Sequence, residues 1–258
     1  MQNPKNILIT GASSGIGREL AIAYAAAGVN LFLCGRDEKK LEAVKILCEQ
    51  LKANVSCKSF DIKNAEACAN WIAEIEQNFA LDLVIANAGI SAGTAGGNES
   101  FKQVKQIFET NVDGVLNIAH PAIEKMLQRK KGQIALMSSL AGFRGLPSSP
   151  AYSASKSAVR VYAESLRGNL AKFGIEVNAI CPGYIRTPMT AVNDFPMPFL
   201  MKVEKAAQLI KHGLAKNKSR IAFPFGLYFV VWLATLLSPK ITDSIFAKLP
   251  QKKSLKIE

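Results

Sequence analysis

Tyr152 and Lys156 are the two side chains in this sequence with the clearest capacity for proton transfer. They stand four residues apart in a segment with helical periodicity, so both project from the same face of the expected helix. A tyrosine phenol has an ordinary pKa of about 10, and a neighbouring ammonium favours the phenolate and brings proton exchange toward neutral pH. The pair therefore predicts a general acid–base centre, in which Tyr152 protonates an alkoxide or takes a proton from an alcohol.

A glycine-rich stretch near the N-terminus predicts a site for phosphate groups. Residues 10–17 read TGASSGIG and lie between a strand-like apolar run and the start of a helix. Backbone N–H groups and the positive end of that helix would face a pyrophosphate. Gly11 would permit the tight turn, Gly15 would let the backbone approach the phosphates, and Gly17 would let helix and strand pack closely. The spacing differs from the commoner G-x-G-x-x-G, so a tight turn without a ligand remains the alternative for this stretch alone.

Five further motifs follow along the chain. They are ANAG at 86–89, N-x-x-G at 111–114, a serine at 139, YSASK at 152–156 and PG at 182–183. Together with TGASSGIG, this set resembles the short-chain dehydrogenase/reductase family over roughly residues 5 to 190. The resemblance implies a Rossmann-type fold, a nicotinamide dinucleotide cofactor and an enzyme that interconverts a carbonyl and a secondary alcohol.

The resemblance also implies a catalytic set of Asn111, Ser139, Tyr152 and Lys156. Lys156 would hydrogen-bond the nicotinamide ribose, Ser139 would position the substrate oxygen, and Asn111 would hold a water that links the lysine to solvent. Ser138 is the alternative to Ser139. Successive strand side chains point to opposite faces, so only one of the two serines can face the pocket, and the spacing favours Ser139. Each residue alone could be structural, but the combination favours catalysis.

The residues after the second predicted strand bear on the choice of dinucleotide. An NAD-preferring site usually has an acidic residue about twenty residues past the glycines, where it binds the ribose 2′-OH. Gly35 occupies that position here and Arg36 follows it. A guanidinium fork suits the 2′-phosphate of NADP. Asp37 is the competing candidate, although it is also expected to cap the next helix. We therefore expect NADP(H) to be preferred over NAD(H).

The resemblance implies further cofactor contacts at the ends of other strands. Asp61 and Ile62 would border the adenine, and residues 87–89 would lie under the adenosine ribose. The stretch PGYIRT at 182–187 would clamp the nicotinamide amide. Turn and cap roles are the alternative explanation for these Asp, Asn, Pro and Gly residues. The complete set of expected cofactor contacts is Gly11, Ser13, Ser14, Gly15, Ile16, Gly17, Arg36, Asp61, Ile62, Asn87, Ala88, Gly89, Tyr152, Lys156, Pro182, Gly183, Ile185 and Thr187.

The elements that must position these residues are short apolar strands that alternate with helices. Buried strands are predicted at 6–10, 30–35, 54–62, 81–89, 132–139 and 175–183. Helices are predicted at 16–28, 37–51, 63–79 and 151–174, with a longer helical stretch across 99–129. The alternation predicts an α/β fold in a single domain, a Rossmann-type doubly wound parallel sheet with helices on both faces. Such sheets bind ligands at the carboxyl ends of their strands.

Composition narrows the class of protein. Apolar residues make up 49% and charged residues 20% of the chain, with no low-complexity run, so a substantial core is expected. The five cysteines form no C-x-x-C and there are two histidines, so we expect neither disulfides nor a metal centre. The first ten residues lack a secretory pattern. We therefore expect a cytoplasmic protein. The C-terminal segment adds the alternative of a position peripheral to the inner face of a membrane.

That C-terminal segment departs from the commonest pattern of the family. We expect residues 1–220 to form the catalytic domain and residues 221–258 to form a hydrophobic and basic extension. Residues from 201 onward hold eleven Lys and Arg against three acidic residues, in a chain of net charge +12. A strand, RIAFP, is expected before a hydrophobic helix, and Pro224 and Gly226 argue against a transmembrane helix. The extension would pack on the domain or on another subunit, or would contact an anionic membrane surface.

Substrate contacts are expected from residues 140–150 and from the loop after Thr187, where Met, Phe and Pro dominate. Such residues favour an apolar substrate, a lipid-, steroid- or bulky ketone-like carbonyl or alcohol, although a lid that packs on the domain is an equal alternative. The sequence thus predicts an NADP-dependent oxidoreductase. The competing hypothesis is a dinucleotide-binding regulator or membrane-associated scaffold without turnover. Nucleic acid is not expected as a partner, and a homodimer or homotetramer is expected by analogy with the family.

Overall fold

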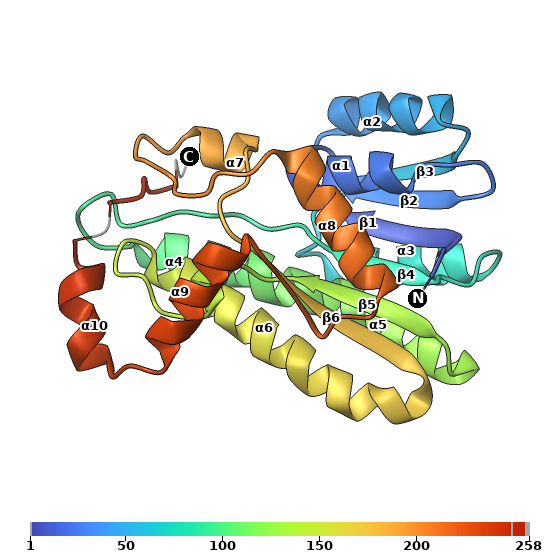
Figure 1. The fold of residues 1–258 in the computed structure, drawn as a ribbon. Coiled ribbons are helices and arrows are strands. Elements are labelled where there is room, and N and C mark those ends of the chain that lie inside the picture. Colours follow the sequence, from blue (N-terminus) through green and yellow to red (C-terminus); the bar gives the residue numbers. More distant parts are fainter. Residues whose placement is uncertain (1, 249, 256–258) are drawn as a thin grey trace.

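A single sheet of seven parallel strands forms the centre of the molecule, in the order β3-β2-β1-β4-β5-β6-β7 (Figure 1). The structure is a computed structural model that describes residues 2–248 and 250–255. The strands are Asn6–Thr10 (β1), Asn30–Gly35 (β2), Asn54–Ser59 (β3), Leu83–Ala86 (β4), Gly132–Met137 (β5), Ile175–Pro182 (β6) and Arg220–Phe223 (β7). The strand order reverses between β1 and β4. The predicted doubly wound parallel sheet is therefore confirmed, and its ligand crevice is expected beside that reversal.

Helices cover both faces of the sheet (Figure 1). One face packs against α1 (Gly15–Tyr24), α2 (Glu38–Gln50) and α8 (Val203–Ala215). The other face packs against α3 (Ala65–Glu76), α5 (Gly114–Arg129) and α6 (Pro150–Leu170). Shorter elements are α4 (Phe101–Phe108), a π-helical turn (Glu109–Asp113), two 3₁₀ turns (Leu140–Gly142 and Ala171–Phe173), α7 (Pro188–Ala191), α9 (Phe225–Thr235) and α10 (Pro239–Phe246).

The core is split in two by the sheet, because successive strand side chains alternate between its faces. Ile7 and Ile9 of β1 lie in the cluster under α1 and α8, whereas Leu8 lies in the cluster under α3 and α5. All three side chains are fully buried. Burial on both faces explains why the strands read as continuous apolar runs rather than as alternating patterns. The result is a rigid sheet that holds its carboxyl ends, and the loops that follow them, in fixed positions.

Some predicted boundaries were wrong, and each has a local cause. Strand β3 ends at Ser59 rather than at residue 62, because its partner β2 ends at Gly35, directly opposite. Strand β4 covers only Leu83–Ala86 of the predicted 81–89, since the next residues turn toward the end of β1. The helical stretch 99–129 is two helices joined by the π-helical turn.

The C-terminal segment begins inside the sheet. Strand β7 pairs with β6, so the expected boundary between residues 220 and 221 falls within a strand. The strand and the hydrophobic helix expected after residue 219 are both present, as β7 and α9. From α10 the chain returns toward α7 (Figure 1). Within the described part of the chain, no helix is both long and apolar enough to cross a membrane.

Candidate active site

The turn between β1 and α1 is shaped by glycine. Gly11 has φ +64° and Gly15 has φ +56°, in the left-handed region that glycine adopts without strain. A Cβ at Gly11 would lie 2.8 Å from the Cα of Ala88, and a Cβ at Gly17 would collide with the carbonyl of Gly11. The turn therefore packs directly on the chain that leaves β4, as the expected roles of Gly11 and Gly17 require.

The same turn leaves hydrogen-bond donors free at the start of α1. Ser14 is the N-cap residue, and its side chain makes no capping hydrogen bond. The first N–H groups of a helix have no partner within the helix, so here they remain available to an anion. A Cβ at Gly15 would meet the side chain of Thr187 at 3.3 Å, which places the loop after β6 on the other side of this opening. Bare backbone donors facing a narrow crevice fit the pyrophosphate of a dinucleotide.

Residues 87–89 connect the ends of β4 and β1. The side-chain amide of Asn87 donates to the carbonyl of Thr10 at 2.9 Å, and the backbone N–H groups of Asn87 and Ala88 both donate to the Thr10 hydroxyl at 3.0 Å. A Cβ at Gly89 would lie 3.2 Å from Nζ of Lys156. The stretch expected under the adenosine ribose thus also joins the glycine turn to Lys156.

The end of β2 presents Arg36 to solvent. A Cβ at Gly35 would lie 3.1 Å from the Ser13 hydroxyl, so this position, which is acidic in NAD-preferring sites, has little room for a carboxylate side chain. Asp37 caps α2 by accepting from the backbone N–H of Lys40 at 3.1 Å, and it forms an ion pair with the Lys40 ammonium at 2.7 Å. These bonds hold the pKa of the Asp37 carboxyl below its ordinary value. The Asp37 carboxylate is therefore already engaged by its own helix.

Asp61 and Ile62 lie just beyond β3 and differ in environment. Asp61 accepts a hydrogen bond from the backbone N–H of Lys63 at 3.0 Å. The Ile62 side chain is buried in the core against Gly114, and its carbonyl accepts from Asn117 at 2.9 Å. Of the two expected adenine neighbours, Asp61 keeps a side chain outside the core, and the Ile62 side chain does not face the crevice.

Tyr152 lies at the centre of a hydroxyl cluster at the carboxyl ends of β4 and β5. Its phenol is hydrogen-bonded to the hydroxyls of Ser139 and Ser91. Ser139 follows β5, accepts from the backbone N–H of Ala141 at 3.1 Å and donates to the carbonyl of Pro182 at 3.3 Å. Burial raises the pKa of the Tyr152 phenol above its ordinary value, and the two hydroxyl partners only partly oppose this. The phenol is therefore protonated at neutral pH, contrary to the expectation that Lys156 would bring its pKa down.

Lys156 lies on the same helix face as Tyr152. Its Nζ donates to the carbonyl of Met137 at 2.9 Å and lies 5.9 Å from the centre of the Tyr152 ring. Burial lowers the pKa of this ammonium to about 8. An ammonium has three donors, so two remain for other partners beside Tyr152.

The two neighbouring serines that follow β5 point in opposite directions, as continued strand geometry predicts. Ser138 is buried and donates to the main-chain carbonyl of Lys156 at 2.6 Å, which fastens α6 to the sheet. Ser139 alone reaches Tyr152. The structure thus gives the two hydroxyls separate roles, one in packing and one in the site.

Asn111 lies in the π-helical turn between α4 and α5 and is fully buried. Its amide donates to the carbonyl of Ile90 at 2.9 Å and to the hydroxyl of Ser155 at 3.1 Å, and its Oδ1 accepts from the backbone N–H of Ile90 at 2.8 Å. Both N–H donors are used. A water linking Lys156 to solvent would have to bind an acceptor of this residue, either Oδ1 or the main-chain carbonyl.

The loop after β6 closes the crevice opposite the glycine turn. Ser139 contacts the carbonyl of Pro182, and Gly183 donates its backbone N–H to Phe223 of β7 at 2.8 Å. Ile185 is buried, and Thr187 caps the short helix α7. Like Ile62, Ile185 packs its side chain into the core, so only its backbone is free to line the crevice.

Two residues of this cluster were not identified from the sequence. Ser91 lies in the loop after β4 and contacts Tyr152. Lys252 lies near the C-terminus, donates to the Ser91 hydroxyl and places Nζ 5.0 Å from the centre of the Tyr152 ring. A serine in a loop and a lysine in a basic segment carry no local pattern that marks them as functional. Only the folded arrangement brings them together.

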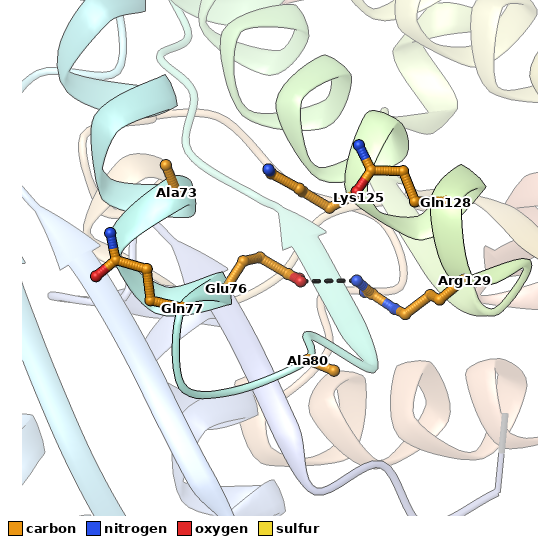
Figure 2. Close-up of a pocket in the computed structure, with 7 residues that line it drawn as sticks. All are labelled: Ala73, Glu76, Gln77, Ala80, Lys125, Gln128 and Arg129. Atoms are coloured by element: carbon orange, nitrogen blue, oxygen red, sulfur yellow. Dashed lines mark hydrogen bonds and ion pairs between the residues drawn. The ribbon is translucent and has the colours of Figure 1, made fainter.

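A separate hollow of about 370 Å³ lies between α3 and α5 (Figure 2). Figure 2 shows Glu76 and Arg129 joined across it by an ion pair of 2.7 Å. Arg129 also donates to the carbonyl of Leu81, which precedes β4, so the hollow lies at the amino end of that strand. It lies at the amino ends of the strands, whereas Tyr152 lies at their carboxyl ends. The fold and the glycine turn instead define a Rossmann-type dinucleotide-binding protein, with a hydroxyl cluster around Tyr152 at the strand ends.

Comparison with known proteins identifies the family. The family model described as short chain dehydrogenase matches residues 5–195. An "Uncharacterized oxidoreductase" of Myxococcus xanthus (strain DK1622) is 36% identical over 246 residues, which cover 95% of this chain and 97% of the relative. The solved short-chain dehydrogenase from Sphingobium yanoikuyae in complex with NADPH has a TM-score of 0.80 at 22% identity, covering 98% of this chain and 99% of that one. An actinorhodin polyketide ketoreductase solved with NADPH has a TM-score of 0.78 at 25% identity, covering 88% and 98%.

The chain therefore belongs to the short-chain dehydrogenase/reductase family. It is an oxidoreductase that binds a nicotinamide dinucleotide and acts on CH–OH or C=O groups. The family model ends at residue 195, but the Myxococcus relative matches 95% of the chain, so that similarity continues into the C-terminal segment.

Proposed function

We propose that this protein is an NADP-dependent oxidoreductase that interconverts a carbonyl and a secondary alcohol on an apolar substrate, with Tyr152 as the acid–base residue. The observation that carries the proposal is the cluster of Ser139, Tyr152 and Lys156 beside the glycine turn. A protein that only bound the dinucleotide would not need a half-buried phenol held by a hydroxyl and flanked by an ammonium.

The chemistry follows from which group holds a proton. A bound nicotinamide supplies the hydride to the carbonyl carbon in reduction and accepts it in oxidation. Ser139 would hold the substrate oxygen by a hydrogen bond, and Tyr152 would transfer its proton to that oxygen as negative charge develops there. The raised pKa of Tyr152 keeps the phenol protonated at neutral pH, which is the form that carbonyl reduction requires.

Lys156 is proposed to act on two groups, a ribose hydroxyl of the dinucleotide and the phenol of Tyr152. Its Nζ is fixed by the carbonyl of Met137, which leaves donors for a ribose hydroxyl and a positive charge beside Tyr152. That charge would stabilise the tyrosinate formed after proton transfer. Asn111 would then serve as a positioning residue, because it joins Ile90 to Ser155, the residue before Lys156.

The preference for NADP rests on the end of β2. Gly35 leaves little room for the carboxylate that would bind a ribose 2′-OH, Asp37 is engaged by its own helix, and Arg36 is exposed. A 2′-phosphate in this position would meet a guanidinium, whose planar donors match phosphate oxygens.

An apolar substrate is supported by the loop after Thr187. Its large apolar side chains Met189, Val192, Phe199 and Leu200 are all exposed. Tyr184 and Phe195 meet edge to face with ring centres 6.4 Å apart, beside the catalytic crevice. Exposed apolar side chains that gather around a site mark a ligand-binding surface. A lipid-, steroid- or bulky ketone-like carbonyl compound fits this lining.

The helices α9 and α10 support a second proposal, contact with an anionic membrane surface. None of the residues of α9 is buried, and Val230 in its middle and Leu236 directly after it are more than 60% exposed. Ile241 and Ile245 extend the apolar surface along α10, and Lys240 lies beside them. A large exposed apolar surface with flanking cations suits the interface of a membrane with anionic lipids.

The first experiment measures NADPH consumption by the purified protein against a panel of apolar ketones and aldehydes, with Tyr152→Phe in parallel. General acid catalysis contributes about 10²- to 10⁴-fold, so the variant should lose at least a hundredfold in kcat and still bind NADPH. Tyr162→Phe is the matched control, because Tyr162 is on the same helix and its hydroxyl contacts His120. Unchanged turnover in Tyr152→Phe would refute the assignment. NADPH binding without turnover of any carbonyl would favour a dinucleotide-binding regulator or scaffold.

A further inference from the structure

The chain after α10 crosses the mouth of the active site. We call Gln251–Leu255 the C-terminal strap. Its carbonyls at Lys252 and Lys253 accept the backbone N–H groups of Ala95 and Gly93, each at 2.8 Å. The backbone N–H of Leu255 donates to Gln103 at 2.8 Å. The strap therefore lies against the loop that leaves β4, the strand beside the reversal of the sheet.

Lys252 is the strap residue that enters the hydroxyl cluster. Its Nζ donates to the Ser91 hydroxyl, which is in turn hydrogen-bonded to Tyr152. Nζ also lies 5.0 Å from the centre of the Tyr152 ring. Burial lowers the pKa of this ammonium to about 8. Tyr152 is thus flanked by two lysines: Lys156 on its own helix and Lys252, from a distant segment, on the side of the β4 loop.

Within residues 2–248 and 250–255, no carboxylate balances the charge of Lys252. Among the residues that the structure describes, its hydrogen-bond partner is the neutral Ser91 and no carboxylate pairs with it. The neighbouring Lys253 forms an ion pair with Asp194 at 3.1 Å, which both anchors the strap and leaves that carboxylate engaged. A partly buried charge without a counterion is costly, and the cost is removed when a ligand brings the opposite charge.

We propose that Lys252 binds a carboxylate of the substrate, so that the preferred substrates are apolar oxo acids whose carboxylate lies a few bonds from the reacting carbonyl. This inference rests on the proposed function, because it takes Tyr152 and Ser139 as the groups that hold the carbonyl oxygen. A single ammonium matches the single charge of a carboxylate better than the larger charge of a phosphate. The short distance follows from Ser91, which contacts Lys252 and Tyr152 at once.

The strap explains how an apolar site could be selective. Apolar lining gives affinity but little discrimination, whereas a buried group that needs a charged partner rejects ligands that lack it. Lys252 would therefore fix which end of an apolar oxo acid enters, and it would place the carbonyl against Tyr152. It is a binding residue in this scheme, and the proton still comes from the phenol.

The test is a binding measurement that does not need turnover. Decanoate and decanamide, an anionic and a neutral ligand of equal chain length, are titrated by calorimetry into the full-length protein saturated with NADP⁺. The wild-type protein should bind decanoate about tenfold or more tightly than decanamide, the gain of one charge-assisted hydrogen bond. Lys252→Gln should remove that difference, and Lys252→Arg should keep most of it. Lys248→Gln is the matched control, because Lys248 is exposed and precedes the strap, and this variant should keep the difference fully. Decyl phosphate in parallel shows whether the site selects a carboxylate.

A kinetic arm compares 3-oxodecanoate with its methyl ester. Lys252→Gln should lower kcat/KM for the acid at least tenfold and leave the ester within about twofold. Equal losses on both compounds would mean that Lys252 acts on Tyr152, and equal gains would mean that the strap only blocks the site. Either result, or no preference for decanoate in the wild-type protein, overturns the inference. Decanoate selectivity without turnover of any carbonyl would instead leave the carboxylate site in place and refute the proposed function.

Discussion

Arg36 carries the proposed choice between two dinucleotides on a single exposed side chain. Arg36→Asp should raise the KM for NADPH about 10- to 100-fold, the worth of a charge-assisted pair, and leave the KM for NADH unchanged or lower. Steady-state kinetics with both dinucleotides measures this. Lys39→Asp is the control, because it makes the same charge change on the exposed side of α2 and not at the end of β2. An NADPH-to-NADH ratio that does not move in Arg36→Asp would contradict the assignment.

Single residues were predictable from the sequence where a motif fixes both their type and their register. Strand alternation required that only one of Ser138 and Ser139 face the pocket, the spacing favoured Ser139, and the structure shows the two hydroxyls on opposite sides. The raised pKa of Tyr152 was not predictable, because it depends on burial in the folded chain and on the hydroxyls of Ser139 and Ser91, not only on the lysine one turn away. Ser91 was missed for the same reason.

At the scale of elements, Gly93 determines how closely the strap can approach the β4 loop. A Cβ at this position would collide with the carbonyl of Ser148 and with Lys252. Backbone atoms cannot swing aside, so Gly93→Ala should displace the strap and make residues 251–255 exchange amide hydrogens faster. Hydrogen exchange read by mass spectrometry is the measurement. Gly97→Ala is the control, because the nearest atom to its Cβ would be 3.8 Å away. Unchanged protection in Gly93→Ala would show that the loop can accommodate the methyl group.

The elements themselves were predicted well in the sheet and poorly after it. Buried runs such as Asn6–Thr10 and Asn30–Gly35 are recognisable because apolar strands between helical patterns have few alternatives. The π-helical turn at Glu109–Asp113 was not predicted, since it interrupts the helix without interrupting the apolar periodicity. The helix α8 and the strap were not assigned at all. The strap reads as a basic, solvated segment, and its position depends on contacts with a loop about 160 residues earlier.

At the scale of the whole molecule, α9 and α10 present an apolar surface that this chain alone does not cover. The double variant V230E/L236E should lower sedimentation with vesicles of phosphatidylserine and phosphatidylcholine by about tenfold or more, because charges enter an apolar interface at high cost. Val161→Glu, on the exposed face of α6, is the control for added charge. Sedimentation velocity on the same samples measures the expected homodimer or homotetramer. Vesicle binding that is equal in all three proteins would refute the membrane proposal, and dissociation of an oligomer in the double variant would assign the surface to a second copy.

The position of the strap also bears on how a substrate enters the site. Because Lys252 lies over the ring of Tyr152, we expect the strap to move aside when a substrate enters. The strap is held by a few backbone hydrogen bonds, each worth about 1 kcal/mol net, and by one exposed ion pair, so its release should cost a small part of the roughly 5–15 kcal/mol that typically holds a whole domain together. Entry to the site is therefore a local opening equilibrium, one that leaves the sheet intact. The backbone N–H groups of Gly93 and Ala95 donate to the strap carbonyls, so their hydrogen-exchange rates would report how often the strap opens.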